Sequence, residues 1–374
     1  MNGGRPIRLL LTGGGTGGHL FPAIASAEAF RAGYPGTEVL FVGTRRKMDA
    51  VSLGNYGFTS RSVHCYGLKG KSPAELLKAL AVLPVSLVQA VGHIRRFRPD
   101  VVLGVGGYVT GPVVTAARLL GIPTVIHEQN SVPGLANRKL ARIADRICLS
   151  LPDSGEFFPG GKTVLTGNPV RQEIADLARQ ERRQDEENLT VLVLGGSQGA
   201  HGLNMLVRDA FCGPGGELLR DIRLIHQTGE RDEAEIRKCY RDIGVQAEVA
   251  AFIRDMPSVY RRADLLVSRA GATTLSELAI LGLPAILVPY PFAADNHQEK
   301  NAGYYVRSGG AVMFRERELT AAALAAALVR ISGDRAGRQR MGEAMRRAAF
   351  PDAAKAIVAV CRQVINDGGR EQHV

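Results

Sequence analysis

Short apolar runs alternate with longer amphipathic stretches from one end of the chain to the other. We predict a strand in each of twelve apolar runs, at residues 7–12, 38–43, 101–104, 124–127, 146–150, 163–166, 190–194, 222–227, 247–252, 265–268, 285–289 and 311–314. Because strands and helices alternate, the pattern predicts an α/β fold with parallel, doubly wound sheets, whose functional loops follow the carboxyl ends of the strands. Six predicted strands fall in each half of the chain.

Two glycine-rich turns lie at equivalent places in the two halves. The sequences GGGTGGH at 13–19 and GGSQG at 195–199 each follow a predicted strand and precede a predicted helix. Glycine has no Cβ, so backbone N–H groups and a helix N-terminus can approach an anion closely. The pair indicates two Rossmann-like domains that face one cleft and bind a phosphate or diphosphate.

The length of 374 residues fits two domains of ordinary size. We place the boundary near residues 167–171, where a predicted strand ends and Pro169 opposes its continuation. The expected domains are therefore 1–168 and 169–349. A last helix at 350–366 is expected to return to the first domain.

Composition indicates a soluble globular enzyme, with 45% hydrophobic residues and no low-complexity tract. The five cysteines are scattered without a C-x-x-C pair, which predicts reduced thiols in the cytosol. The first apolar stretch is too short for a signal peptide and runs directly into the glycine turn, so we expect no export.

The net charge of +11 is concentrated in the first half. Residues 1–168 hold 19 Lys and Arg against 9 Asp and Glu, whereas the remainder holds 28 against 27. No nucleic-acid-binding motif accompanies this charge, and the chain has no tryptophan for base stacking, so we expect no nucleic-acid partner. An anionic membrane surface would attract the same positive charge.

The apolar segment 68–85 is flanked by basic residues and contains Lys78 and Pro84. A membrane-spanning helix needs about 20 mostly apolar residues, so this segment should not cross a bilayer. It either lies on a membrane surface or simply covers the sheet, and leucine spacing does not separate these two readings. The positive charge of the first half slightly favours the reading in which the segment lies on a membrane surface.

A nicotinamide enzyme is one alternative, because Gly13, Gly15 and Gly18 satisfy the G-x-G-x-x-G pattern. Such a site needs an acidic residue after the second strand to bind the ribose, and this chain has none there. Arg45 and Arg46 could instead bind the phosphate of NADP, so the alternative stays open.

The stretch 269–277 predicts a nucleotide site in the second half. It combines a strand end, a glycine turn and a helix start, and we expect Glu277 in the first helical turn, where its carboxylate would accept hydrogen bonds from both ribose hydroxyls. Thr274 and Glu277 also fit a capping box, which needs no ligand. The loop 289–302 supplies Asp, Asn, His and Gln side chains that suit the hydroxyls of a sugar.

Seven ordered motifs carry a resemblance to a known family. They are 13–19, 106–112, 127–130, 167–171, 195–199, 269–277 and 295–301. With these motifs, almost the whole chain resembles the MurG family of bacterial N-acetylglucosaminyltransferases, which have the GT-B fold. The resemblance implies transfer of N-acetylglucosamine from UDP-N-acetylglucosamine to lipid I, an undecaprenyl diphosphate that carries a muramyl pentapeptide, to form lipid II for peptidoglycan.

The resemblance also implies a set of donor-binding residues. They are Thr16, Gly17, Gly18, Asn130, Arg171, Ser197, Ile253, Ala272, Thr273, Glu277, Gln298 and Asn301. Among them, Ile253 would contact the uracil, Glu277 the ribose, and Ser197 and Arg171 the diphosphate. Gln298 and Asn301 would face the sugar. The family commonly has two adjacent glutamines here, whereas this chain has His297 before Gln298, which leaves the role of that histidine open.

Acceptor binding falls to the first domain on the same resemblance. The residues implied are Gly14, Gly15, Gly18, His19, Tyr108, His127 and Glu128. A membrane-bound acceptor agrees with a basic, apolar surface on this domain. The family implies a peripheral enzyme on the cytoplasmic face of the cell membrane, without a transmembrane helix, and leaves room for contacts with other cell-wall synthesis proteins.

The implied reaction inverts the anomeric carbon in one displacement, as the C4 hydroxyl of the muramyl sugar attacks C1 of the donor. His19 is our candidate general base and Glu128 the alternative. His19 could also cap its helix or orient the acceptor diphosphate. No D-x-D-like motif ends a predicted strand, so we expect no metal or other cofactor, with a helix N-terminus and Arg171 holding the diphosphate.

Two other function classes stay open on the sequence. A related GT-B enzyme could use the same donor with another lipid, or epimerise the sugar nucleotide. A non-catalytic membrane scaffold would keep the basic surface but would not need two glycine turns and a polar sugar loop.

Overall fold

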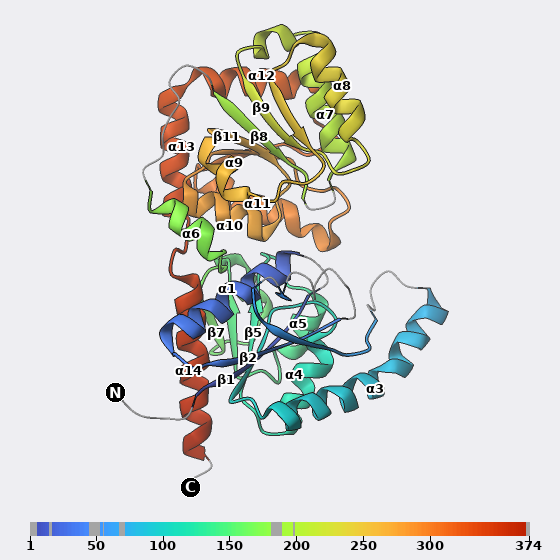
Figure 1. Ribbon diagram of the computed structural model, residues 1–374, viewed down its shortest axis with the longest axis vertical. Helices are drawn as coiled ribbons and strands as arrows, with labels where there is room; N and C mark the ends of the chain where they lie inside the picture. Colours follow the sequence, from blue (N-terminus) through green and yellow to red (C-terminus); the bar gives the residue numbers. More distant parts are fainter. Residues whose placement is uncertain are drawn as a thin grey trace. The chain divides into compact units, whose positions relative to one another are not determined.

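A computed structural model describes residues 6–14, 17–44, 53–54, 56–66, 72–180, 189–196 and 199–371, without the side chains of 73–80 and 369–371. The chain forms two compact units (Figure 1). Unit 1 comprises Met1–Gln172 and Phe350–Val374, and unit 2 comprises Glu173–Ala349. The division lies shortly after the expected boundary at 168, so Arg171 belongs to unit 1.

Unit 1 is built on a parallel sheet of seven strands in the order β3-β2-β1-β4-β5-β6-β7. The strands are β1 Arg8–Thr12, β2 Glu38–Gly43, β3 Thr59–Ser62, β4 Val101–Gly104, β5 Thr124–Glu128, β6 Arg146–Leu149 and β7 Thr163–Leu165. At the centre, Leu10 of β1 pairs with Leu40 of β2 and with Val102 of β4. All seven carboxyl ends therefore lie along one edge.

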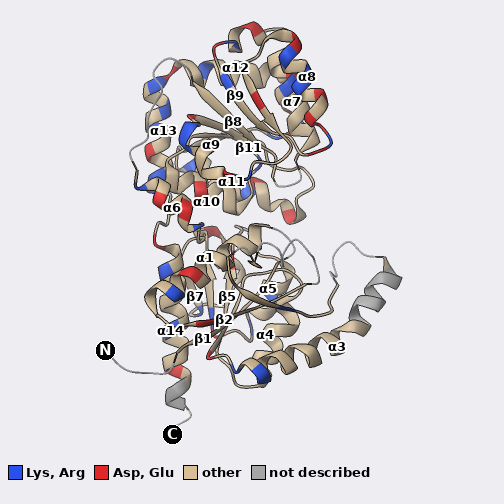
Figure 2. Cartoon of the chain, viewed as in Figure 1, with Lys and Arg blue, Asp and Glu red and all other residues tan. Residues whose placement is uncertain are grey.

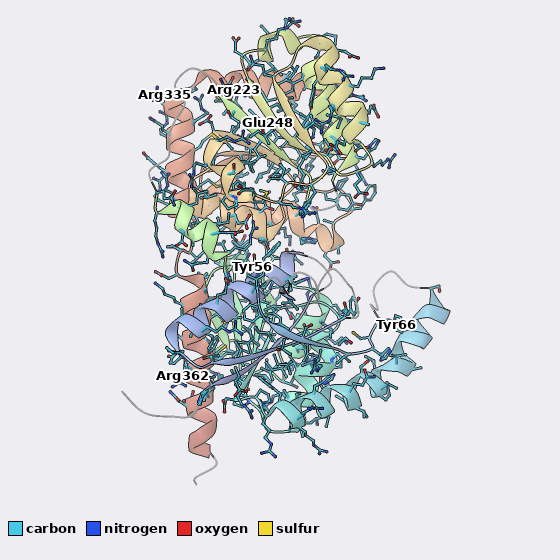
Figure 3. All side chains as sticks on the ribbon, viewed as in Figure 1. Tyr56, Tyr66, Arg223, Glu248, Arg335 and Arg362 are labelled. Atoms are coloured by element: carbon cyan, nitrogen blue, oxygen red, sulfur yellow. A yellow bond between two sulfur atoms is a disulfide. The ribbon has the colours of Figure 1, made fainter. Side chains whose placement is uncertain are left out.

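Helices cover both faces of this sheet (Figure 1). They are α1 Gly17–Gly33, α3 Pro73–Phe97, α4 Thr110–Leu119, α5 Leu135–Leu140 and α14 Ala353–Glu371, with the short η1 Pro152–Phe157. Leu9 and Leu11 share one core with α1 and α14, whereas Leu10 faces the core under α3 and α4. Arg362 of α14, labelled in Figure 3, lies over the ring of Tyr34 beside α1.

Unit 2 is built on a parallel sheet of six strands in the order β10-β9-β8-β11-β12-β13. The strands are β8 Thr190–Leu194, β9 Arg223–Gln227, β10 Ala247–Ala250, β11 Leu265–Ser268, β12 Ala285–Leu287 and β13 Ala311–Met313. The helices are α6 Gln172–Ala178, α7 His201–Cys212, α8 Glu233–Ile243, α9 Met256–Arg262, α10 Ala272–Leu281, α11 His297–Arg307, α12 Ala321–Gly333 and α13 Arg335–Arg347, with η2 Gly216–Leu219 and η3 Ala294–Asn296.

All twelve predicted strands are present, and the prediction of two parallel, doubly wound domains is confirmed. The sequence reasoning missed β3, whose four residues are Thr, Ser, Arg and Ser. Among the strands that the structure describes, β3 lies at the edge of the sheet and pairs only with β2. An edge strand needs no apolar run, so hydrophobic patterning could not reveal it.

The expectation that all five cysteines are reduced is wrong for one pair. Helices α7 and α8 pack together in unit 2, and they bring Cys212 and Cys239 into a disulfide across 27 residues of sequence. Sequence spacing gave no sign of this pairing, because it depends on how two helices pack. Cys65, Cys148 and Cys361 are free.

Helix α3 contains residues 73–85 of the apolar segment 68–85, which had two readings, and continues to Phe97. Beyond that segment, Ser86, Ala90 and Ile94 are buried in unit 1 at a spacing of four residues, so the later part of the helix covers the sheet. On other faces of the helix, Val85 and Val88 are exposed. Residues 67–71 lie outside the described residues. Among the helices that the structure describes, none is long and apolar enough to cross a membrane.

Candidate active site

The first glycine turn in unit 1 packs against the turn that follows β4. A Cβ added to Gly107 would come within 2.8 Å of the Gly14 carbonyl oxygen, so two backbones meet here without side chains between them. Gly17 and Gly18 open α1, which places a helix N-terminus beside this turn. Gly15 and Thr16 lie outside the described residues. A helix N-terminus is a favourable place for an anion, and the diphosphate site expected at this turn stays a prediction.

His19 is the third residue of α1, and its ring rests on the β4 turn. A Cβ on Gly106 would come within 2.8 Å of His19 Cδ2 and 3.0 Å of its Nε2, and Gly106 has a φ of +99°. Only glycine fits both constraints. Because His19 lies inside the helix and does not precede it, it is not the N-cap residue, which excludes the simple capping role.

His127, on β5, is 0% exposed. Its Nδ1 lies 3.0 Å from Gln129 Nε2, and its Nε2 lies 2.9 Å from Ser150 Oγ and 3.2 Å from the Gly167 carbonyl oxygen. Burial lowers the pKa of His127 to about 4, with a smaller effect of the nearby His19, so the ring is neutral at pH 7. The ring thus holds neighbouring protein groups in place, and its expected contact with the acceptor stays a prediction.

Glu128 ends β5, and both of its carboxylate oxygens are occupied. Oε1 accepts hydrogen bonds from the backbone and side-chain nitrogens of Asn130, at 2.9 and 3.2 Å. Oε2 accepts from Asn137 Nδ2 at 2.9 Å and from the Gly134 nitrogen at 3.1 Å. Burial raises the pKa of this carboxyl, although these bonds oppose the shift. These four bonds hold the loop at 130–137 and Asn130, and the role of Glu128 as the alternative general base stays a prediction.

The remaining expected residues of unit 1 lie at the same edge of the sheet. Asn130 and Tyr108 are both half-buried, in the loops that follow β5 and β4. Arg171 is mostly buried, and its guanidinium lies 4.7 Å from the ring centroid of Phe21, two residues after His19 on α1. This contact places a positive group beside the first helix, within unit 1.

Glu277 lies in the second turn of α10, and not in the first turn as expected. The N-cap residue is Gly271, which makes the capping-box reading of Thr274 and Glu277 wrong. Glu277 is buried, and its Oε2 accepts a hydrogen bond of 2.8 Å from the hydroxyl of Tyr260. Sequence reasoning missed Tyr260, because an aromatic residue on a short amphipathic helix is typical of a core position. The expected donor residues Ala272 and Thr273 form the partly exposed start of α10.

Gln298 and Asn301 of α11 both reach the turn before α10. Gln298 Oε1 accepts from the backbone nitrogens of Ala270 and Tyr290, at 3.2 and 2.9 Å. Asn301 is fully buried and donates to the Ala270 carbonyl oxygen at 3.3 Å. The two side chains thus join the loop 289–302 to the turn before α10.

The sugar loop itself has an uncommon backbone. Asp295 and Asn296 have φ values of +53° and +54°, a conformation that non-glycine residues seldom adopt. His297 Nδ1 lies 2.8 Å from the Ala294 carbonyl oxygen, so this ring nitrogen donates to the backbone of η3. His297, which stands where the family commonly has a glutamine, thus helps to hold this loop in place. Such strained positions often occur at binding sites.

The second glycine turn follows β8, and Ser197 with Gln198 lies outside the described residues. On its described part, the Gly196 carbonyl oxygen accepts a hydrogen bond from Gln227 Nε2, and the nitrogen of Ile253 donates to Gln227 Oε1, both at 2.9 Å. Sequence reasoning did not single out Gln227. The sequence feature that could have identified Gln227 is a polar residue at the carboxyl end of a predicted strand.

No group of three or more His, Cys, Asp or Glu side chains that could hold a metal occurs among the described residues. This finding leaves metal independence as a prediction. Arg45 and Arg46, on which the NADP alternative rested, lie outside the described part of the chain.

Two family models match the chain. They are the glycosyltransferase family 28 N-terminal domain over residues 9–149 and the glycosyltransferase family 28 C-terminal domain over residues 190–357. A curated protein of Desulfotalea psychrophila is 61% identical over 97% of this chain and 98% of its own length. The chain belongs to glycosyltransferase family 28.

The curated relative is named UDP-N-acetylglucosamine--N-acetylmuramyl-(pentapeptide) pyrophosphoryl-undecaprenol N-acetylglucosamine transferase. A protein of the same name from an Anaeromyxobacter species is 45% identical over 96% of this chain and 94% of its own. Among solved structures, the crystal structure of Acinetobacter baumannii MurG has a TM-score of 0.76 and 30% identity, covering 96% of this chain and 100% of that one. The resemblance to the MurG family and the GT-B fold is confirmed, and a nicotinamide enzyme is excluded.

Proposed function

We propose that this glycosyltransferase transfers N-acetylglucosamine from UDP-N-acetylglucosamine to the C4 hydroxyl of the muramyl sugar of lipid I, which forms lipid II. The observation that carries the proposal is the 61% identity to a transferase of that name along nearly the whole of both chains. The unit 2 site supports it, because a buried carboxylate, a glycine turn and two amide side chains suit a ribose, a diphosphate and a sugar.

In the proposed donor complex, Glu277 binds the ribose and the backbone at Ile253 binds the uracil. Gln298 and Asn301 line the sugar pocket, and the first turn of α10 with Ala272 and Thr273 faces the nucleotide. The second glycine turn and the N-terminus of a helix hold the diphosphate. Fixed hydrogen-bond donors stabilise the negative charge that develops on the departing UDP, so we propose that no metal is required.

In the proposed acceptor complex, the glycine turn before α1 binds the diphosphate of lipid I. His19 takes the proton of the attacking hydroxyl, because it lies at the carboxyl edge of the sheet and is only half-buried. Glu128 fixes Asn130 and its loop, and His127 holds the adjacent strand ends. A single displacement at C1 inverts the configuration of the donor sugar.

Purified protein incubated with UDP-N-acetylglucosamine and a lipid I analogue tests this function. We expect release of UDP and formation of the disaccharide product in equal amounts, with the same rate in EDTA and in added Mg²⁺. UDP release without disaccharide would contradict lipid I as acceptor, and conversion of the donor to an epimer would indicate the related enzyme class. A rate that falls strongly in EDTA would contradict only the proposal that no metal is required.

We further propose that unit 1 docks peripherally on the cytoplasmic face of the membrane through the exposed face of α3. Pro84, Val85 and Val88 are exposed on the middle of this helix, which carries no charged residue from 81 to 94. Figure 2 shows Lys and Arg gathered at its C-terminal end, where Arg95 and Arg96 are exposed. An apolar stripe that ends in cations suits an anionic lipid surface.

Val88→Asp should weaken binding to vesicles that contain phosphatidylglycerol by roughly 10- to 100-fold. The change removes apolar burial and adds a charge that the surface repels. Val88 is 71% exposed, so the fold should tolerate the change. Vesicle co-sedimentation measures the effect, with Leu218→Asp, at a 69% exposed position of unit 2, as the control. Equal losses in both variants, or none in Val88→Asp, would contradict docking through α3.

A further inference from the structure

Gln227 is the last residue of β9, and its buried side chain joins two loops of unit 2. Its Nε2 donates to the carbonyl oxygen of Gly196 at 2.9 Å. Its Oε1 accepts from the nitrogen of Ile253, also at 2.9 Å. One carboxamide therefore bonds to the glycine turn after β8 and to the segment after β10.

A carboxamide is suited to this position because it carries a donor and an acceptor on one rigid group. The carbonyl of Gly196 needs a donor, and the N–H of Ile253 needs an acceptor. A carboxylate supplies only acceptors, and an apolar side chain of the same size supplies neither. Both bonds have the ordinary length of 2.9 Å and are partly buried, so the loss of either would leave a backbone polar group without its protein partner.

The residue that follows Gln227 also packs against the glycine turn. A Cβ on Gly199 would lie 2.1 Å from the carbonyl oxygen of Thr228, the residue after Gln227. Thr228 and Gly229 in turn donate to the carbonyl oxygens of Ala250 and Ala251, each at 3.0 Å. Gly196 and Gly199 thus pack with the ends of β9 and β10, and Gln227 is a side-chain link among them.

The two loops joined by Gln227 have different ligands in the proposed donor complex. The turn at 195–199 holds the diphosphate, and the backbone at Ile253 holds the uracil. We infer that Gln227 is a positioning residue that sets the spacing between these two subsites, so that the site recognises uridine and diphosphate as one connected ligand. This inference rests on the proposed function, and it assigns no contact between Gln227 and the donor itself.

The test compares the affinity for UDP with the affinity for uridine, by titration calorimetry, in the full chain and in Gln227→Met. Methionine is of similar size and makes neither bond. We expect UDP binding to weaken roughly 10- to 100-fold and uridine binding by less than threefold, because uridine occupies only one subsite. A merely structural role would weaken both ligands by the same factor and lower the thermal unfolding midpoint of the ligand-free protein. Equal factors, or no loss, would overturn the inference.

Gln227→Glu gives a second readout that does not depend on a change of size. A protonated carboxyl can donate to Gly196 and accept from Ile253, whereas a carboxylate cannot donate. We expect the UDP affinity of this variant, relative to the wild-type protein, to recover as the pH is lowered, with no such recovery in Gln227→Met. Absence of recovery would overturn the inference. Failure of the unsubstituted protein to bind UDP would instead overturn the proposed function, and this inference with it.

Discussion

Replacement of His19 by alanine is expected to lower kcat for disaccharide formation by about 10²- to 10⁴-fold, with a much smaller effect on the KM for UDP-N-acetylglucosamine. The proposed base acts on the acceptor hydroxyl, so its loss affects the chemical step and leaves the donor site in unit 2 intact. Steady-state kinetics with a soluble lipid I analogue measure both parameters. His19 is only half-buried, so removing its ring should leave the fold unchanged.

His19→Gln separates base catalysis from orientation of the acceptor diphosphate. Glutamine can donate a hydrogen bond to a phosphate, but it cannot accept a proton at neutral pH. If His19 is the base, the glutamine variant should be as slow as the alanine variant, and imidazole in solution should restore part of the activity only for alanine. A glutamine variant with near-normal kcat would show that His19 orients the acceptor. Glu128→Gln, which keeps the size of the side chain, should reduce the rate less than either His19 variant.

The architecture of both units could be predicted because their strands are buried on two faces. Such strands are almost continuously apolar, and the twelve runs were visible for that reason. The strand β3 was missed because its four polar residues lie at a sheet edge. The disulfide between Cys212 and Cys239 was missed because it depends on the packing of α7 on α8, which no local pattern encodes.

The candidate site could be predicted only in part. Glycine turns and polar loops at strand ends marked the right places, because a parallel sheet gathers such loops at one edge. The role of each residue was harder, because it depends on contacts between loops that are distant in sequence. Glutamate is a residue type that often acts as a general base, yet the carboxylate of Glu128 accepts four hydrogen bonds from its own loop. Tyr260 and Gln227 act through partners 17 and 26 residues away, so no short motif contains them.

Glu277→Ala is expected to lower kcat/KM for UDP-N-acetylglucosamine by about 10²- to 10³-fold. The proposed carboxylate accepts a hydrogen bond from each ribose hydroxyl, and a hydrogen bond to a charged group contributes about 1.5 to 3 kcal/mol. The effect should be smaller when the donor lacks the 2′-hydroxyl, because one of the two bonds is then absent in both proteins. Kinetics with normal and 2′-deoxy donors measure this difference.

Glu277→Gln and Tyr260→Phe distinguish ribose binding from support of the fold. Glutamine can still accept the hydrogen bond from Tyr260, which the structure places at 2.8 Å, but it lacks the charge that strengthens bonds to the ribose. Phenylalanine removes that hydrogen bond and keeps the carboxylate. If Glu277 binds the ribose, the glutamine variant should lose about 10-fold or more in kcat/KM while its thermal midpoint stays close to normal. Equal losses with normal and 2′-deoxy donors would contradict ribose binding and leave Glu277 as a buried partner of Tyr260.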